Sequence, residues 1–326
     1  MKILYAASNN SNAKIQLYRF LGAMSGSNHQ IKVAAYKRSS PKDISVDWCL
    51  DALLNFCQPE TTSLNNDNLV IYFDQIKSYA PDLIISDLEY FTSFIANELN
   101  VQLWQCSSSL INFAMTRREK YDLGLSKYYY YAANMAYEHT QRIVHLIDNS
   151  DRNFVYSHFG DAESPPTLQN GFEWIRPYHQ IHKEYTPCQH YAVAALTGSN
   201  KKVIDVLKKY TDSVVFMDYC AEKYENVLVK DIAIQDEYYC NLKNSPLFIC
   251  QGQTSFLADA FYNGKFSIIY PDYNDAEAVT NSHLSTKFGL GQITTYKEDI
   301  SLFANNIVNP RYNEDIKWLH EKVAEL

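Results

Sequence analysis

Glycine is scarce in this sequence, with only 10 among 326 residues. The sequence contains neither a Walker phosphate-binding loop nor the G-x-G-x-x-G fingerprint of dinucleotide-binding folds, so both of these phosphate-binding motifs are excluded. No two aspartates are spaced as D-x-D, which leaves a metal-bridged diphosphate site without support. Because no run of 18 apolar residues occurs, a membrane-spanning helix is not expected either.

The cysteines also exclude certain sites. There are 7 of them, scattered along the chain without any C-x-x-C spacing. This pattern favours reduced thiols in a cytosol-like compartment and argues against zinc. The start, MKILYAASNN, is typical of a strand followed by a polar loop and not of a signal peptide. We therefore expect a cytoplasmic protein, or one in the host-cell cytoplasm if its source is viral.

Short apolar runs alternate with segments of helical periodicity along most of the chain. Leu247 to Cys250, for example, is long enough for a buried strand and too short for a helix. The repeated strand-helix order predicts parallel sheets with helices on both faces. Expected strands cover residues 2–7, 31–36, 83–86, 101–105, 153–158, 191–196, 213–217, 227–230, 247–250 and 266–270. Expected helices cover residues 13–24, 46–56, 69–79, 91–99, 116–149, 201–210, 235–242, 254–262, 299–308 and 314–326.

The stretch from Gly160 to Pro187 interrupts this alternation. It contains Pro165-Pro166, Gly171 and Pro177 and has little periodicity, as linkers do. We therefore predict an N-terminal domain of residues 1–160, a linker of residues 161–189, a second domain of residues 190–308 and a C-terminal helix of residues 309–326.

Polar residues follow several of the expected strands. Gln251-Gly252-Gln253-Thr254-Ser255 follows one, and Asp272 to Glu277 follows the next. In parallel sheets, ligands bind beyond the carboxyl ends of the strands. Gly198-Ser199 lies between a strand and a helix N-terminus, a position suited to an anion. The second half of the sequence therefore predicts a ligand-binding site, and its pattern favours an anionic ligand.

The same stretch resembles the donor-binding half of GT-B nucleotide-sugar glycosyltransferases, in particular the UDP-glucuronosyltransferase-like and N-acetylglucosaminyltransferase-like enzymes. The resemblance implies an α/β GT-B fold with two Rossmann-like domains facing across a cleft. It also implies inverting, metal-independent transfer from a nucleotide sugar, most simply a UDP-sugar, as co-substrate and without a tightly bound cofactor. The matching positions are Gln251, Gly252, Gln253, Ser255, Asp259, Ala260, Gly264, Pro271, Glu277, Ala278, Asn281, Gly289 and Gly291.

The resemblance assigns roles to individual residues. Gln251 and Gln253 stand where the family has His and Gly, and neither brings a positive charge to the diphosphate. Asp259 matches the acid that holds the ribose hydroxyls. Ala278 replaces a sugar-binding Gln, which leaves the donor sugar open. The remaining predicted donor contacts are Gly198, Ser199, Gly252, Thr254 and Ser255 for the diphosphate, Ile232 for the base, and Glu277 and Asn281 for the sugar.

The family's catalytic His, in the loop after the first strand, has no counterpart here. That loop reads Ser8-Asn9-Asn10, and we expect it to contact the acceptor. A base must still deprotonate the acceptor hydroxyl, and Asp87 at a strand end is the first candidate, with Glu89 second. Asp87 could equally cap the helix that follows it. His158 could also reach the cleft. The missing His leaves open an inactive scaffold that only binds nucleotide sugars.

The acceptor remains open as well. It could be a small molecule, a lipid-linked sugar or a protein. It could also be DNA carrying a hydroxymethylated base, as for phage-encoded transferases of this architecture. A net charge of −8 gives no overall attraction to DNA. A basic face on the first domain could still be formed by Lys14, Arg19, Lys37, Arg38, Arg117, Arg118 and Lys120.

Overall fold

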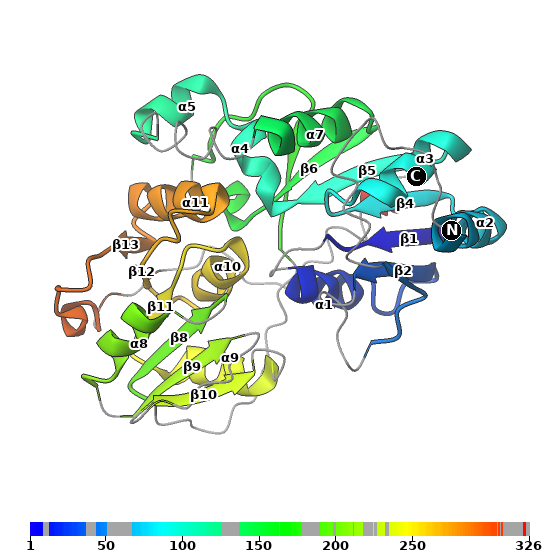
Figure 1. Cartoon of the computed structure of the whole chain (residues 1–326). Coiled ribbons are helices and arrows are strands. Elements are labelled where there is room, and N and C mark those ends of the chain that lie inside the picture. Colours follow the sequence, from blue (N-terminus) through cyan, green and yellow to red (C-terminus); the bar gives the residue numbers. More distant parts are fainter. Residues whose placement is uncertain are drawn as a thin grey trace.

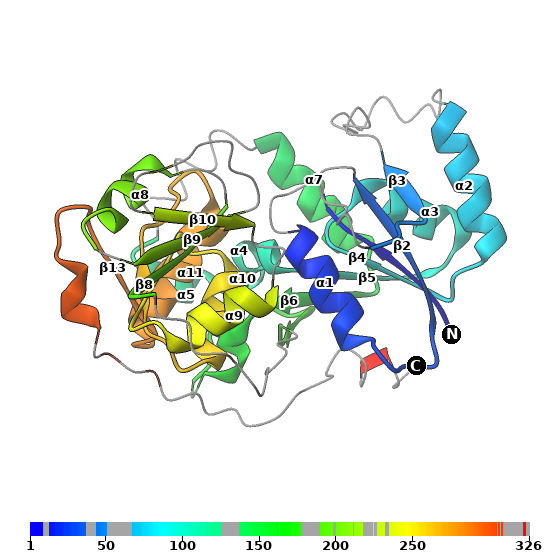
Figure 2. The same ribbon diagram turned by 90° about the horizontal axis from the view of Figure 1, so that it is seen from below.

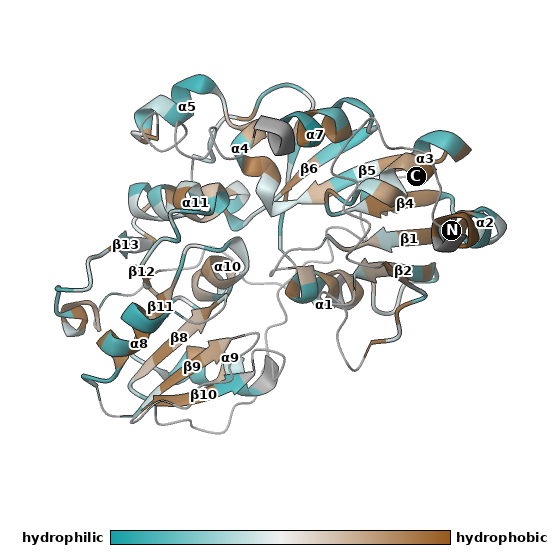
Figure 3. Ribbon diagram, viewed as in Figure 1, coloured by the Kyte–Doolittle hydropathy of each residue, from teal (hydrophilic) through white to brown (hydrophobic). Residues whose placement is uncertain are grey.

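A computed structural model of the chain contains two parallel β-sheets with helices packed against them (Figure 1). Figure 3 shows hydrophobic residues along β4, β9 and β11, inside the two sheets. None of the described helices is long and apolar enough to cross a membrane. The structure describes residues 1–8, 13–36, 44–50, 67–125, 137–162, 164–177, 190–197, 200–210, 212–217, 224, 227–231, 235–304, 306, 308 and 322–323.

The first sheet has seven strands in the order β3-β2-β1-β4-β5-β6-β7, all parallel. Alternate residues of β1 face opposite sides: Ile3 packs with Leu17 of α1, whereas Leu4 packs with Ile76 of α2 and Ile95 of α3. Helices therefore cover both faces. The strands are β1 (Lys2–Ala6), β2 (Gln30–Tyr36), β3 (Trp48–Leu50), β4 (Leu83–Ser86), β5 (Gln102–Ser107), β6 (Arg152–Tyr156) and β7 (Phe172–Ile175), and the helices are α1 (Ala13–Ala23), α2 (Asp67–Tyr79), α3 (Tyr90–Leu99), α4 (Ile111–Ala114), α5 (Arg117–Asp122) and α7 (Tyr137–Asp148).

The second sheet has six parallel strands in the order β10-β9-β8-β11-β12-β13. Val193 of β8 packs with Phe256 of α10, and Ala194 packs on the opposite face with Ile204 of α8. The strands are β8 (Ala192–Leu196), β9 (Ser213–Met217), β10 (Val227–Asp231), β11 (Leu247–Cys250), β12 (Ser267–Ile269) and β13 (Gly291–Ile293), and the helices are α8 (Lys201–Leu207), α9 (Gln235–Asn244), α10 (Thr254–Tyr262) and α11 (Ala276–Lys287).

Several sequence predictions differ from the structure. A helix was expected over residues 46–56, but Trp48 and Leu50 are buried on one face of strand β3 with Cys49 exposed between them, the alternation of a strand. Strand β7 lies within the expected linker, so the first sheet continues to Ile175. A helix was also expected over residues 299–308, but the described part of that range has a 3₁₀ turn, Ile300–Phe303, and no α-helix. The helix expected over residues 116–149 is interrupted after α5, at Gly124 with φ +67.

The two domains are in direct contact through helices α1, α4 and α11. Ile15 of α1 packs into the core beside β8, and Figure 2 shows α1 on the side of the first domain that faces α9 and α10. Val279 of α11 packs with Ile111 of α4. Val323 lies in the core of the first domain, so the chain crosses back after the second domain. The carboxyl ends of the two sheets are therefore brought together.

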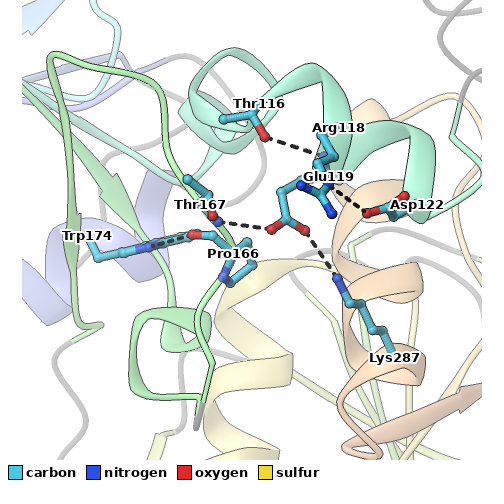
Figure 4. A network of polar contacts seen from close by, with 8 residues as sticks. All are labelled: Thr116, Arg118, Glu119, Asp122, Pro166, Thr167, Trp174 and Lys287. Atoms are coloured by element: carbon cyan, nitrogen blue, oxygen red, sulfur yellow. Dashed lines mark hydrogen bonds and ion pairs between the residues drawn. The ribbon is translucent and has the colours of Figure 1, made fainter.

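A polar network at the rim of this contact joins α5 to α11 (Figure 4). Thr116 caps α5, and Glu119 accepts a hydrogen bond from the backbone N–H of Thr167 at 3.3 Å. Lys287 of α11 lies 3.1 Å from Glu119. Both charged side chains are partly exposed to water, so we expect this ion pair to contribute little to stability.

Candidate active site

The loop between β11 and α10 contains the predicted diphosphate contacts. Gln251 accepts a hydrogen bond from the backbone N–H of Thr197 at 3.2 Å, and Gln253 donates one to the Thr197 hydroxyl at 3.1 Å. These bonds hold together the loops that follow β8 and β11. The Gln253 side chain makes no cap bond to α10. The Ser255 hydroxyl is buried and has no hydrogen-bond partner among the residues that the structure describes. The start of α10 thus has the N–H groups and dipole that favour an anion.

Gly252 brings this loop against α11. Its φ of +96° favours glycine. A Cβ at this position would lie 2.4 Å from the Ser282 hydroxyl and 2.5 Å from the carbonyl oxygen of Ala278. Only glycine therefore allows this approach of loop and helix.

Three of the predicted donor contacts lie together beside this loop. The Glu277 carboxylate accepts hydrogen bonds from Thr254 at 2.9 Å and from Ser109, in the first domain, at 2.8 Å. The amide nitrogen of Asn281 donates to the Thr254 hydroxyl at 2.8 Å. Asp275 caps α11, and burial together with the Glu277 charge raises its pKa; burial likewise raises the pKa of Glu277. The Thr254 hydroxyl of α10 and the carboxylate and amide of α11 thus lie together, where they can bind hydroxyl groups.

Asp259 lies one turn further along α10 and is engaged with the first domain. It is 1% exposed, and its Oδ1 lies 2.6 Å from Nη2 of Arg19 and 3.3 Å from the Tyr239 hydroxyl. Arg19 also donates to the carbonyl oxygen of Ser255 at 3.1 Å. Placing Arg19 on a basic surface was wrong, because it is buried in this ion pair.

The first domain contributes Asp87, directly after β4. Its carboxylate is buried and accepts a hydrogen bond from the Ser8 hydroxyl at 2.6 Å. Burial raises the pKa of Asp87 to about 6, although hydrogen bonds from Ser107 and Ser8 oppose this rise. The next residue, Leu88, has φ +54 and turns the chain sharply. A carboxyl with this pKa is ionised at neutral pH and can accept a proton.

Glu89, the second candidate base, caps α3. It accepts hydrogen bonds from the backbone N–H groups of Phe91 at 3.0 Å and Thr92 at 2.7 Å, and from the Tyr36 hydroxyl at 2.9 Å. The capping role that the sequence allowed for Asp87 thus belongs to Glu89. Asp87 is left as the stronger candidate.

Replacing Glu89 with Ala should lower the free energy of unfolding by about 2 kcal/mol, because α3 loses its N-cap. Chemical denaturation measures this change. Glu98→Ala, on the exposed surface of the same helix, is the matched control and should change stability by less than about 0.5 kcal/mol. Equal losses in the two variants would contradict the capping role.

His158 lies at the domain contact with its ring centroid 5.4 Å from that of Phe261. Burial, reinforced by the positive charge of Arg19, lowers its pKa to about 3. His158 is therefore neutral at physiological pH, and both burial and the Arg19 charge oppose the imidazolium that a histidine base must form.

The sequence reasoning missed two groups of polar residues in the first domain. Ser107 ends β5, and Ser108 and Ser109 follow it directly; a run of serines at the carboxyl end of a strand was a usable signal. Gln16 of α1 donates to Ser108 at 2.9 Å. The role of Arg19 had no local signal, since its partner lies 240 positions away.

Some predicted residues cannot be compared with the structure. The acceptor-loop residues Asn9 and Asn10 and the donor residues Gly198, Ser199 and Ile232 lie outside the described residues, as do Lys37 and Arg38 of the predicted basic face.

Comparison with solved structures gives matches that run through both domains. The glycosyltransferase SsfS6 of Streptomyces sp. SF2575, complexed with thymidine diphosphate, has a TM-score of 0.60 and 12% identity, with 100% of both chains covered. The chain has the GT-B fold. This GT-B chain also matches the glycotransferase of kitacinnamycin, with a TM-score of 0.58, 13% identity and coverage of 93% of this chain and 90% of the other.

A third match broadens the range of activities found on this GT-B fold. The UDP-GlcNAc 2-epimerase of Methanocaldococcus jannaschii has a TM-score of 0.53 and 10% identity, with 99% of both chains covered. No protein-family model and no curated protein matches the sequence. Likeness at such low identity establishes the fold, whereas the activity has to be argued from the site.

Proposed function

We propose that this GT-B protein transfers a sugar from a nucleoside diphosphate sugar to an acceptor hydroxyl, with inversion and without a metal. The observation that carries the proposal is the hydrogen bond of 2.8 Å from Ser109 to Glu277. It joins the carboxyl end of the first sheet to that of the second at a cluster of buried polar groups. Donor and acceptor held on the two domains would meet there.

The donor would bind to the second domain. Its diphosphate would accept hydrogen bonds from the first N–H groups of α10, from the Ser255 hydroxyl and from the Gln251 and Gln253 amides. The sugar hydroxyls would contact Glu277 and Asn281. Uridine diphosphate sugars are the first candidates. Thymidine diphosphate sugars come second, because a structural neighbour binds thymidine diphosphate.

Asp87 would act as the base. It would accept the acceptor's hydroxyl proton as the oxygen attacks the anomeric carbon and the bond to the diphosphate breaks. Ser8 and Ser107 would hold the carboxylate in position through their hydrogen bonds. The positive end of α10 would stabilise the charge on the departing diphosphate. The loop that begins at Ser8 has no counterpart of the His of the resembling enzymes, so the proton would pass directly to Asp87.

The first domain would bind the acceptor at its strand ends. DNA gains no support here, because Arg19 is buried in an ion pair and is unavailable to a basic face. A small hydroxyl-bearing molecule is the simpler candidate. If the protein does not bind DNA even at low salt, DNA is excluded as the acceptor.

Calorimetric titration with uridine and thymidine diphosphate sugars, followed by mass-spectrometric detection of transfer, tests the proposal. We expect one nucleotide to bind with a dissociation constant of about 1 μM to 1 mM, the usual range of enzyme substrates. Absence of binding by every nucleotide would contradict it. If the protein epimerises the donor when no acceptor is present, its reaction is epimerisation and the proposed transfer is wrong. Binding without turnover on any acceptor would favour the inactive scaffold.

A further inference from the structure

The ion pair between Arg19 and Asp259 connects the two domains at the residue expected to hold the donor ribose. Nη2 of Arg19 lies 2.6 Å from Asp259 Oδ1, and the exposed fractions of the two side chains are 4% and 2%. Burial alone would lower the pKa of Arg19, but the Asp259 carboxylate holds that pKa above its usual value. Arg19 therefore keeps its charge, and the Asp259 carboxylate is its principal counter-ion.

The guanidinium is incompletely satisfied in this position. Its Nε and Nη1 are buried and have no hydrogen-bond partner within the described ranges. Around it, the His158 ring nitrogens and the Ser255 and Tyr238 hydroxyls are buried and, among described residues, equally without partners. A polar group that is buried without a hydrogen-bond partner destabilises the closed arrangement, because it has lost its bonds to water. A permanent structural ion pair would be expected to satisfy more of these groups.

Arg19 also covers the face of α10 that the donor would use. Ser255 and Asp259 are four positions apart and so lie on the same face of the helix. Arg19 contacts both, and each is only 1% exposed. A ribose cannot reach the Asp259 carboxylate while the guanidinium occupies this face.

We infer that Arg19 is a latch on the donor site, holding the domains together without donor and leaving Asp259 when the nucleotide binds. This inference rests on the proposed function. In a uridine nucleotide the two vicinal ribose hydroxyls can donate to Asp259 in place of the guanidinium. A thymidine nucleotide, which lacks the 2′ hydroxyl, can donate from its 3′ hydroxyl, so the carboxylate accepts a hydrogen bond in both states. Withdrawal of α1 also exposes Ile15, which packs in the second domain. The donor's affinity is reduced by the free energy of this opening.

Titration of uridine and thymidine diphosphate into the wild type and Arg19→Met tests the latch. Met fills similar apolar volume but cannot pair with Asp259. We expect Arg19→Met to bind the nucleotide about ten-fold more tightly, since opening no longer breaks an ion pair. The matched control is Lys287→Met, which removes the interdomain pair with Glu119 away from the donor loop. It should stay within about two-fold of the wild type.

Unchanged or weaker binding by Arg19→Met would overturn the latch. Weaker binding would mean that Arg19 touches the ligand, for example its diphosphate. Absence of nucleotide binding by both proteins would instead refute the proposed function. The two failures are therefore distinguishable.

Hydrogen–deuterium exchange of the wild type gives a second readout, which does not depend on the variant's folding. Saturating nucleotide should increase exchange in α1, residues 13–23, as that helix leaves α10. Residues 251–259 should become protected by the bound nucleotide. Protection of α1 together with this loop would overturn the latch, because α1 would then have stayed in place.

Discussion

Replacing Asp87 with Asn should lower the turnover of sugar transfer by about 100- to 10,000-fold, the usual contribution of a positioned general base. The Asn side chain keeps the shape of Asp and can still bond to Ser8 and Ser107, but it cannot accept the acceptor's proton. Nucleotide affinity should not change, because Asp87 directly follows β4 in the first domain, whereas the donor would bind to the second domain. Steady-state kinetics and calorimetric titration measure the two effects separately.

The pH dependence checks the same assignment. The wild-type kcat/KM should fall as pH decreases through about 6, where Asp87 becomes protonated and can no longer act as a base. The residual kcat/KM of Asp87→Asn should not show this decrease at low pH. Asp122→Asn, a surface change on α5, should keep both the turnover and the pH profile of the wild type. Full turnover in Asp87→Asn would show that another group is the base.

Replacing Gly252 with Ala should lower the free energy of unfolding by about 3 kcal/mol. The backbone at this residue is in the left-handed region, at φ +96. The added Cβ would in addition meet the Ser282 hydroxyl at 2.4 Å and the Ala278 carbonyl oxygen at 2.5 Å. Relief of these contacts would push the loop away from α11 and separate Gln251 and Gln253 from Glu277. We therefore expect nucleotide binding to be lost together with stability.

Gly289→Ala is the matched control for this change. Gly289 also has a positive φ, +67, but apart from its chain neighbours no described residue has an atom within 4 Å of the position that its Cβ would take. Its substitution should cost only about 1–2 kcal/mol of backbone strain and leave nucleotide affinity unchanged. Thermal denaturation and titration of both variants compare the two. If Gly252→Ala and Gly289→Ala lose equal stability and affinity, the close approach of loop and helix is not what makes Gly252 necessary.

The local pattern of the sequence was sufficient to predict most of the sheet framework. Residues 213–217, 247–250 and 254–262 form elements with the predicted bounds, because each is an apolar run or an apolar periodicity with a clear end. Strand β3 was missed since an alternation of three residues is too short to separate from a helix. Strand β7 was missed because it lies between Gly171 and Pro177, both of which indicate a loop.

The candidate site was predictable only where its residues follow strands. Gln251 to Ser255 could be found in this way, and Asp87 likewise. The partners of these residues depend on how the domains pack, so the contacts of Glu277 with Ser109 and of Asp259 with Arg19 could not be read from the sequence. The distinction between Asp87 and Glu89 also required the structure, since either residue could have capped α3.

A crystal structure with uridine or thymidine diphosphate bound is the most direct test of the donor site. We expect the diphosphate at the N-terminus of α10, within hydrogen-bonding distance of Ser255. The 3′ hydroxyl of the nucleoside, together with the 2′ hydroxyl in the uridine case, should contact Asp259 in place of Arg19. A nucleotide bound away from the carboxyl ends of β8, β11 and β12 would contradict this account of the protein.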